Sequence, residues 1–190
     1  MICYEDYSCR KVGDSVIIAR DTRDKIDRHR NVDEGLLALG HQIVRTKLYV
    51  GDVALLNDMT VCIDLKQGLQ ECYSNIIQQH QRFVNECIRA KQAGIKLIIL
   101  VEESGIETVC DVSKWINKRA VKWEKLRDAH RQGRRMNEPL NPYPPVSSER
   151  LAKAMQTISD RYGVEWRFCD KADTARTICE ILGIEVDKND

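Results

Sequence analysis

The run IKLIILV at residues 95–101 places a tight restriction on the fold. A short, nearly continuous apolar run that stops at Glu102 is typical of a β-strand with both faces buried. Helices on both sides of a sheet provide such a position. The run therefore predicts a central strand in an α/β domain.

Segments on either side of this run alternate between strand and helix patterns. Strands are predicted at residues 15–20, 41–48, 52–56, 60–66 and 164–169. Helices are predicted at 32–39, 68–93, 111–131, 148–162 and 174–182. Ser147 or Ser148 would cap the fourth helix, and Gly163 would end it. The alternation predicts one α/β domain over residues 1–190, with a mixed central sheet flanked by helices.

Charge is distributed unevenly, although the net charge is only +1. Residues 114–135 contain nine Lys or Arg and two acids, which leaves the rest of the chain acidic. The basic helix and the Pro-rich loop after it suggest an insertion at 104–147. A basic arm on an acidic body is typical of a protein that binds a polyanion. A solvated charged helix is the open alternative.

Several classes of protein are not supported. The eight cysteines and four histidines show no CxxC, HxxxH or HExxH spacing, so no zinc site is expected and the thiols should be reduced. No apolar stretch reaches the length of a membrane span, and residues 1–11 lack a signal-peptide core. Neither GxGxxG nor a Walker A motif is present. We expect a cytoplasmic protein without contact to a membrane.

Alternation in residues 61–66 separates two sets of side chains. One face carries Val61, Ile63 and Leu65, and the other carries Cys62, Asp64 and Lys66. Asp52 joins the second set only if it pairs with Asp64. A three-residue loop at 57–59, or a bulge near Gly51, gives this pairing, whereas a two-residue loop at 57–58 would place Asp52 opposite Ile63.

Two carboxylates beside a lysine suit metal-assisted hydrolysis of a phosphodiester. Asp52 and Asp64 would hold Mg²⁺, which prefers oxygen ligands and keeps several waters. Such an ion activates a bound water, and Lys66 would orient that water and offset charge on the phosphate. A surface hairpin with an ordinary Asp–Lys pair is the open alternative, because Asp-x-Lys is a short and common pattern.

A series of motifs surrounds this pair. In chain order they are Asp21-Thr22-Arg23-Asp24, Gly51-Asp52, Asp64-Leu65-Lys66, Arg82-Phe83-Val84-Asn85-Glu86 and Leu100-Val101-Glu102. The series resembles the nuclease domain of the XPF-type structure-specific endonucleases, a branch of the PD-(D/E)xK restriction-endonuclease-like superfamily. The resemblance covers residues 15–103, and more loosely 148–183. Asp64 and Leu65 stand where the family has Glu and Arg.

This resemblance implies a restriction-endonuclease-like fold and a metal-dependent DNA endonuclease that acts on branched or flapped DNA in recombination or repair. It implies that Asp21, Asp52 and Asp64 are catalytic ligands of Mg²⁺ or Mn²⁺, and that Lys66 positions the water. It implies supporting roles around the site for Arg23, Glu71, Arg82 and Glu86. An i,i+4 ion pair on the helix surface is the alternative for Arg82 and Glu86.

DNA is the implied partner, including junctions between single and double strands. On the predicted helix 111–131, lysines recur at steps of four, four and three, and with one arginine they would follow a DNA backbone. The DNA-binding candidates are Lys114, Lys118, Arg119, Lys122 and Lys125. Trp115 and Trp123 are expected in core or dimer packing. No tandem helix-hairpin-helix segment, a frequent DNA-binding part of the family, follows in this sequence.

Two further expectations concern assembly and context. A homodimer could use apolar residues of the last two helices, with ordinary core burial as the alternative; these residues are Leu151, Met155, Ile178 and Ile181. The Trp-containing insertion resembles that of short bacterial and phage forms, which implies the cytoplasm of a bacterial or phage-infected cell. The alternative function is a catalytically weak or inactive DNA-binding or partner module on the same fold.

Overall fold

A mixed β-sheet organises the fold in the computed structural model, which describes residues 15–24, 27–134 and 138–186. Within these residues six strands lie in the order β2-β1-β3-β4-β5-β6. Their bounds are β1 Ile17–Asp21, β2 Gln42–Thr46, β3 Val53–Leu55, β4 Asp58–Lys66, β5 Lys96–Glu102 and β6 Glu165–Cys169. β3 is antiparallel to both of its neighbours, while β1 pairs with β2, and β5 with β4 and β6, in parallel.

β5 is the central strand that the apolar run predicts. It lies between β4 and β6, and Leu97 through Val101 are each at most 2% exposed. Alternate residues of this strand belong to two different hydrophobic clusters, one on each face of the sheet. The α/β architecture with a mixed sheet covered on both faces is therefore confirmed.

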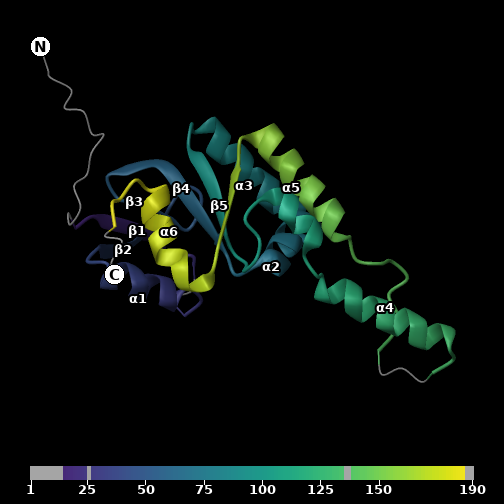
Figure 1. The fold of residues 1–190 in the computed structure, drawn as a ribbon. Coiled ribbons are helices and arrows are strands. Elements are labelled where there is room, and N and C mark those ends of the chain that lie inside the picture. Colours follow the sequence, from purple (N-terminus) through teal and green to yellow (C-terminus); the bar gives the residue numbers. More distant parts are fainter. Residues whose placement is uncertain (1–14, 25–26, 135–137, 187–190) are drawn as a thin grey trace, which may run out of the picture.

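Helices cover the two faces unequally (Figure 1). The main helices are α1 Arg30–Ala38, α2 Leu69–Tyr73, α3 His80–Gln92, α4 Lys118–Arg131, α5 Ser148–Tyr162 and α6 Thr174–Ile181, with a π-helical segment at Ser74–Gln78 and 3-10 helices at Val109–Lys114 and Lys171–Asp173. α1 and α6 pack together on one face, whereas α2, α3 and α5 cover the other. None of the helices in the described part of the chain has the length and hydrophobicity needed to cross a membrane.

The signals for α5 are confirmed. The Ser147 side chain accepts a hydrogen bond from the backbone N–H of Arg150, and the helix ends at Gly163 in the left-handed conformation. The proposed dimer residues of α5 and α6 lie in the core of the chain itself, because Leu151, Met155 and Ile178 are fully buried. These three side chains are not accessible to a second copy, whereas Ile181, the fourth predicted residue, is only partly buried.

The predicted helix at 111–131 is wrong as one element. A 3-10 helix ends at Lys114, Trp115 is extended, and Asn117 then starts α4 by accepting a hydrogen bond from Arg119 N–H. The break turns Val112 and Trp115 into the core, while Ile116 is 71% exposed. Lys114 is therefore not on the same helix as the other lysines.

α4 projects away from the body (Figure 1). Not one of its residues is buried. Trp123, which was expected in core or dimer packing, donates its indole N–H to the Asn141 carbonyl oxygen over 2.7 Å and stacks under Arg127. We call α4 together with residues 138–146 the basic arm. It is joined to the body at Tyr73, whose ring lies under Arg119 and whose hydroxyl accepts from Val146 N–H.

Candidate active site

The pairing of β3 with β4 brings Asp52 and Asp64 together, as predicted. Val53 pairs with Ile63, and the same register continued by one residue sets Asp52 opposite Asp64. The backbone N–H of Asp52 donates to the Ile63 carbonyl oxygen over 2.7 Å, and the Asp52 carboxylate accepts from Leu65 N–H over 2.9 Å. The cause differs from the prediction. The turn is short, with Leu55 opposite Asp58, and the register shift lies between Ala54 and Leu55 instead of near Gly51.

Gly51 makes this close approach possible. Its φ is +71°, a left-handed conformation that residues with a side chain rarely adopt. A Cβ atom at this position would lie 2.9 Å from the carbonyl oxygen of Ile63. That oxygen also accepts the Asp52 N–H, so neither partner can move away without breaking the bond. Glycine is thus required immediately before the first carboxylate.

A cavity of about 650 Å³ opens over these residues. Its acidic lining residues are Asp21, Asp24, Asp27, Asp52, Asp64 and Glu86. Its basic lining residues are Arg23, Arg28, Lys66, Arg82 and Arg89. Both carboxylates of the predicted pair and the predicted lysine therefore face one space. A surface hairpin does not describe them, since Asp64 and Lys66 are only 5% and 6% exposed.

Asp64 and Lys66 form a buried ion pair, with 2.5 Å between Asp64 Oδ2 and Lys66 Nζ. Burial raises the pKa of Asp64 well above its ordinary value, and the carboxylates of Asp52 and Glu86 add to this rise while Lys66 opposes it. Burial lowers the pKa of Lys66, but Asp64 and Asp52 outweigh it, so the net pKa is raised and the ammonium stays charged. The cluster thus holds more negative charge than its lysine neutralises.

Asp21 is fully engaged by the protein. Its two oxygens accept four hydrogen bonds, three from the backbone N–H and guanidinium of Arg23 and one from Leu48 N–H. Burial raises the pKa of Asp21, but these donors reverse the effect and lower it overall. A carboxylate offers about four acceptor positions. Asp21 therefore has no free position for a metal and instead fixes Arg23 at the cavity wall.

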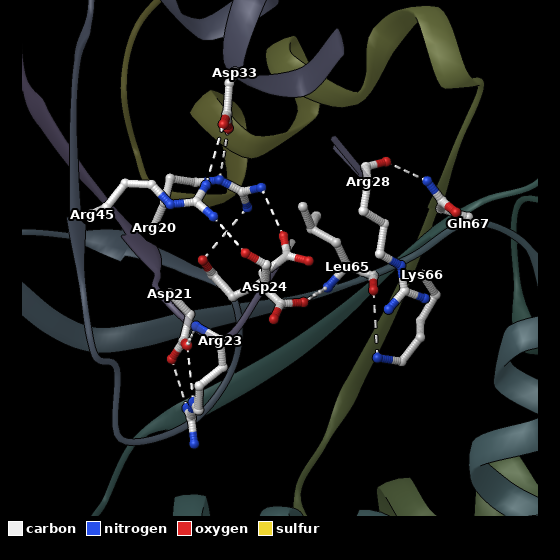
Figure 2. A network of polar contacts seen from close by, with 11 residues as sticks. Arg20, Asp21, Arg23, Asp24, Arg28, Asp33, Arg45, Leu65, Lys66 and Gln67 are labelled. Atoms are coloured by element: carbon white, nitrogen blue, oxygen red, sulfur yellow. Dashed lines mark hydrogen bonds and ion pairs between the residues drawn. The ribbon is translucent and has the colours of Figure 1, made fainter. Parts of the chain in front are cut away.

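Behind the cavity, Arg20 alternates with Asp21 along β1 and points toward α1. It is 1% exposed and contacts Asp33 over 2.7 Å and Asp24 over 3.1 Å. Arg45 joins the same network through the Asp24 carbonyl oxygen and Asp33, as Figure 2 shows. The network pins the loop after β1, and burial together with the Asp52 carboxylate raises the pKa of Asp24.

The supporting residues occupy three positions. Glu86 accepts a hydrogen bond from Gly51 N–H over 3.0 Å, so α3 holds the turn that carries Asp52. Arg82 contacts Gln79 and makes no ion pair with Glu86, which removes the surface-pair alternative. Glu71 lies outside the cavity lining, where it accepts from Gln67 N–H and pairs with the cavity residue Arg28.

The predicted DNA-binding residues do not form one stripe. Lys114 pairs with Asp111 on the 3-10 helix, Arg119 lies over Tyr73, and Lys122 pairs with Glu138. Lys118 and Lys125 make no ion pair or side-chain hydrogen bond with the residues that the structure describes, so their charges face solvent.

The cavity offers two carboxylates to a hard divalent cation, and the other ligands of such a cation would be water or phosphate oxygens. Across the described ranges, no three His, Cys, Asp or Glu side chains are grouped so that they could hold a metal ion together. Mg²⁺ commonly uses one or two carboxylates and completes its shell with water or phosphate oxygens. Asp52 and Asp64 meet this requirement, since both carboxylates line the cavity and the partner of the buried Asp64 Oδ2 is the Lys66 ammonium.

Sequence reasoning did not select Asp24, Asp27, Arg28, Asn75 or Arg89 as site residues, although all five line the cavity. Asp24 was within a quoted motif. Asn75 belongs to the π-helical segment, which no sequence pattern marked. Arg89 was detectable, because it lies seven residues after Arg82 and so on the same face of α3.

Comparisons with known proteins agree with the fold. A model of the ERCC4 domain family matches residues 11–181. The solved structure of XPF from Aeropyrum pernix superposes with a TM-score of 0.54 at 18% identity, over 88% of this chain and 60% of that one. XPF from the same organism in complex with DNA matches with a TM-score of 0.54 at 16% identity, over 89% and 64%. This chain spans less than two thirds of their length. The comparison with curated proteins finds no match.

Proposed function

The chain belongs to the ERCC4 domain family, and on this basis we propose that it is a metal-dependent endonuclease that hydrolyses phosphodiester bonds in DNA. Branched or flapped DNA, met in recombination or repair, is the proposed substrate. One observation carries the proposal. Asp52, from the turn before β3, and Asp64 and Lys66, both from β4, converge on one cavity that also holds arginines.

Asp52 and Asp64 are the residues that would hold Mg²⁺ or Mn²⁺. The excess of acid in the cluster favours a cation there, since it would relieve the repulsion that raises the pKa of Asp64. When bound, such an ion supplies a water of lowered pKa and offsets charge on the phosphate. Asp21, whose oxygens are occupied by Arg23 and Leu48, is proposed to position its neighbours rather than to bind metal.

The side chains of this protein supply the remaining steps. Lys66 keeps its proton and points its ammonium at the cavity, where it can orient the attacking water and stabilise negative charge on the phosphorane-like transition state. Glu86 holds the Gly51–Asp52 turn, so the two carboxylates keep their separation. Arg23 is 53% exposed on its side chain and anchored by Asp21, which places a fixed cation at the cavity rim.

The basic arm is proposed to bind the DNA backbone. α4 carries six Lys or Arg and two acids, and it buries none of them. Lys118 and Lys125 are unpaired among the described residues and lie seven positions apart, on one side of the helix. Backbone contacts of this kind give affinity without sequence preference.

An inactive DNA-binding module remains the second candidate. The observation in its favour is that Asp64 is one methylene shorter than the glutamate of the family and forms an ion pair with Lys66. Such a module would bind DNA but would not cleave it in the presence of Mg²⁺ or Mn²⁺.

The test uses flap, fork, four-way junction, single-stranded and duplex DNA with Mg²⁺ or Mn²⁺. Asp64→Ala should abolish both cleavage and metal binding measured by calorimetric titration. Asp160→Ala removes a carboxylate from the exposed side of α5 and should leave both unchanged. Equal cleavage by wild type and Asp64→Ala would assign the activity to a contaminant, and binding without cleavage would select the second candidate.

A further inference from the structure

The cations of the cavity divide into two groups. Arg23, Arg28 and Lys66 each form an ion pair, with Asp21, Glu71 and Asp64 respectively. Arg82 and Arg89 line the same cavity and form none with the described residues, although six acids lie around them. Among the residues that the structure describes, the one side chain that bonds Arg82 is the neutral Gln79. The positive charges of Arg82 and Arg89 are therefore not neutralised by a carboxylate of the described residues.

α3 presents these two arginines in a row. The opposite side of the helix is anchored in the core by Phe83, Val84, Cys87 and Ala90. Because seven residues make nearly two helical turns, Arg82 and Arg89 lie on one face, about 10.5 Å apart along the axis. One strand of B-DNA rises about 3.4 Å per nucleotide. Because the backbone also winds around the duplex, successive phosphates lie farther apart than this rise, so the two positions match phosphates about two steps apart, one on each side of a phosphate between them.

Glu86 fixes this row relative to the metal-binding carboxylates. It lies between the two arginines on the same face of α3 and accepts the hydrogen bond from Gly51 N–H, directly before Asp52. The turn bearing Asp52 thus meets α3 near the middle of the row, with one arginine toward each end. A DNA strand that placed a phosphate at Asp52 and Asp64 and ran along α3 would pass both arginines.

We infer that Arg82 and Arg89 form a clamp for the cut strand, each binding a phosphate on one side of the scissile linkage. The inference rests on the proposed function, which supplies the strand and the cut. Both are positioning residues, because neither touches the reacting phosphate. A guanidinium suits this role, since its planar donors can contact two phosphate oxygens at once.

Neutral methylphosphonate linkages test the clamp one phosphate at a time. In wild type, a neutral linkage at either of two positions, about two steps apart, should weaken binding about tenfold in EDTA. Arg82→Ala should become insensitive at one position only, and Arg89→Ala at the other. Each alanine variant should also flatten the dependence of log affinity on log salt by about 0.7–0.9. Lys91→Ala, on the same helix but outside the cavity, should do neither.

Kinetics separate positioning from chemistry. Arg82→Ala and Arg89→Ala should raise KM far more than they lower kcat, because a flanking contact is made equally in ground and transition states. Thermal unfolding confirms that each variant is folded. The clamp is wrong if folded variants keep the wild-type sensitivity at both positions or lose it at the same position, and this result leaves cleavage by the wild type untouched. If the two position-specific losses are seen but the wild type cuts no DNA, the clamp stands as a strand-binding device and the proposed nuclease activity is wrong.

Discussion

Replacing Gly51 by alanine tests whether the turn before Asp52 is as tightly built as the structure indicates. Two separate costs meet at this position. The backbone is left-handed at φ +71°, and an added Cβ would lie 2.9 Å from the Ile63 carbonyl oxygen. Gly94 offers a matched control, because its φ is +68° but no atom lies within 4 Å of the corresponding Cβ. The difference between the two variants isolates the steric contact.

The magnitude follows from these two terms. A left-handed backbone costs a non-glycine residue about 1–2 kcal/mol, and the stiffer unfolded chain returns about 0.4–1 kcal/mol. Gly94→Ala should therefore cost about 1 kcal/mol in the free energy of unfolding. The contact with Ile63 should add about 2 kcal/mol, in the range of other overpacked sites. For a domain of this length these costs lower the Tm by about 3 °C for Gly94→Ala and by about 6 °C more for Gly51→Ala.

Thermal unfolding of the two variants beside wild type measures both terms. Cleavage or metal binding by Gly51→Ala should also fall at temperatures where the variant is folded, because the Asp52 carboxylate is displaced with the turn. Gly94→Ala should keep wild-type activity, since the residue lies between α3 and β5 and outside the cavity lining. Equal Tm values for the two alanine variants would refute the close approach of Gly51 to β4.

Three further perturbations probe other parts of the molecule. Burial lowers the pKa of His41 below 6.5, and neither ring nitrogen has a hydrogen bond to the described part of the chain, so wild-type stability should fall as the pH drops below 6.5; in His41→Leu, the Tm should fall less over the same range. The double variant of Lys118 and Lys125 to Ala should bind DNA more weakly and reduce the salt slope by about 1–2, while Lys114→Ala, whose lysine is paired, should not. Asn117→Ala should accelerate hydrogen exchange in α4 and cost about 1–2 kcal/mol in global stability, because it removes both the cap of α4 and the bond to the Val146 carbonyl oxygen; unchanged exchange in α4 would contradict the capping role.

Much of the sheet could be predicted because the strands carry local signals. The run at 95–101 and the alternation at 61–66 each define a strand and its faces without reference to the rest of the chain. Face alternation showed that Asp52 and Asp64 share a face only if they pair, and it made that pairing conditional on an odd-length loop or a bulge. The position of the register shift did not, because nothing in the sequence distinguishes a bulge beside Leu55 from one beside Gly51.

The error at 111–131 has a physical cause. Helical periodicity continues through Trp115 and Ile116, so local spacing favours one helix. The break depends on tertiary contacts, namely the packing of Trp115 against the core and the bond from the Asn117 amide to the Val146 carbonyl oxygen. A contact across 29 residues leaves no mark on local periodicity.

The site was only partly visible in the sequence for a related reason. Motifs identified Asp52, Asp64 and Lys66, but the state of a charge depends on what lies beside it. Nothing in the sequence indicates that Asp21 would be saturated by Arg23 and Leu48 N–H, or that Arg89 would lack a partner. Motif spacing finds the residues of such a cluster, whereas their division into ligands, anchors and free cations requires coordinates.

Because α4 is separate from the core, its sequence can evolve faster than that of the folded body. Substitutions in this helix disturb no packed interior, so the folded body should tolerate them. The same substitutions would directly alter which polyanion the basic arm binds. Diversification of target choice can therefore proceed on the projecting element while the carboxylate cluster stays constant. A library randomised only in α4 should consequently retain mostly folded members with widely differing affinities.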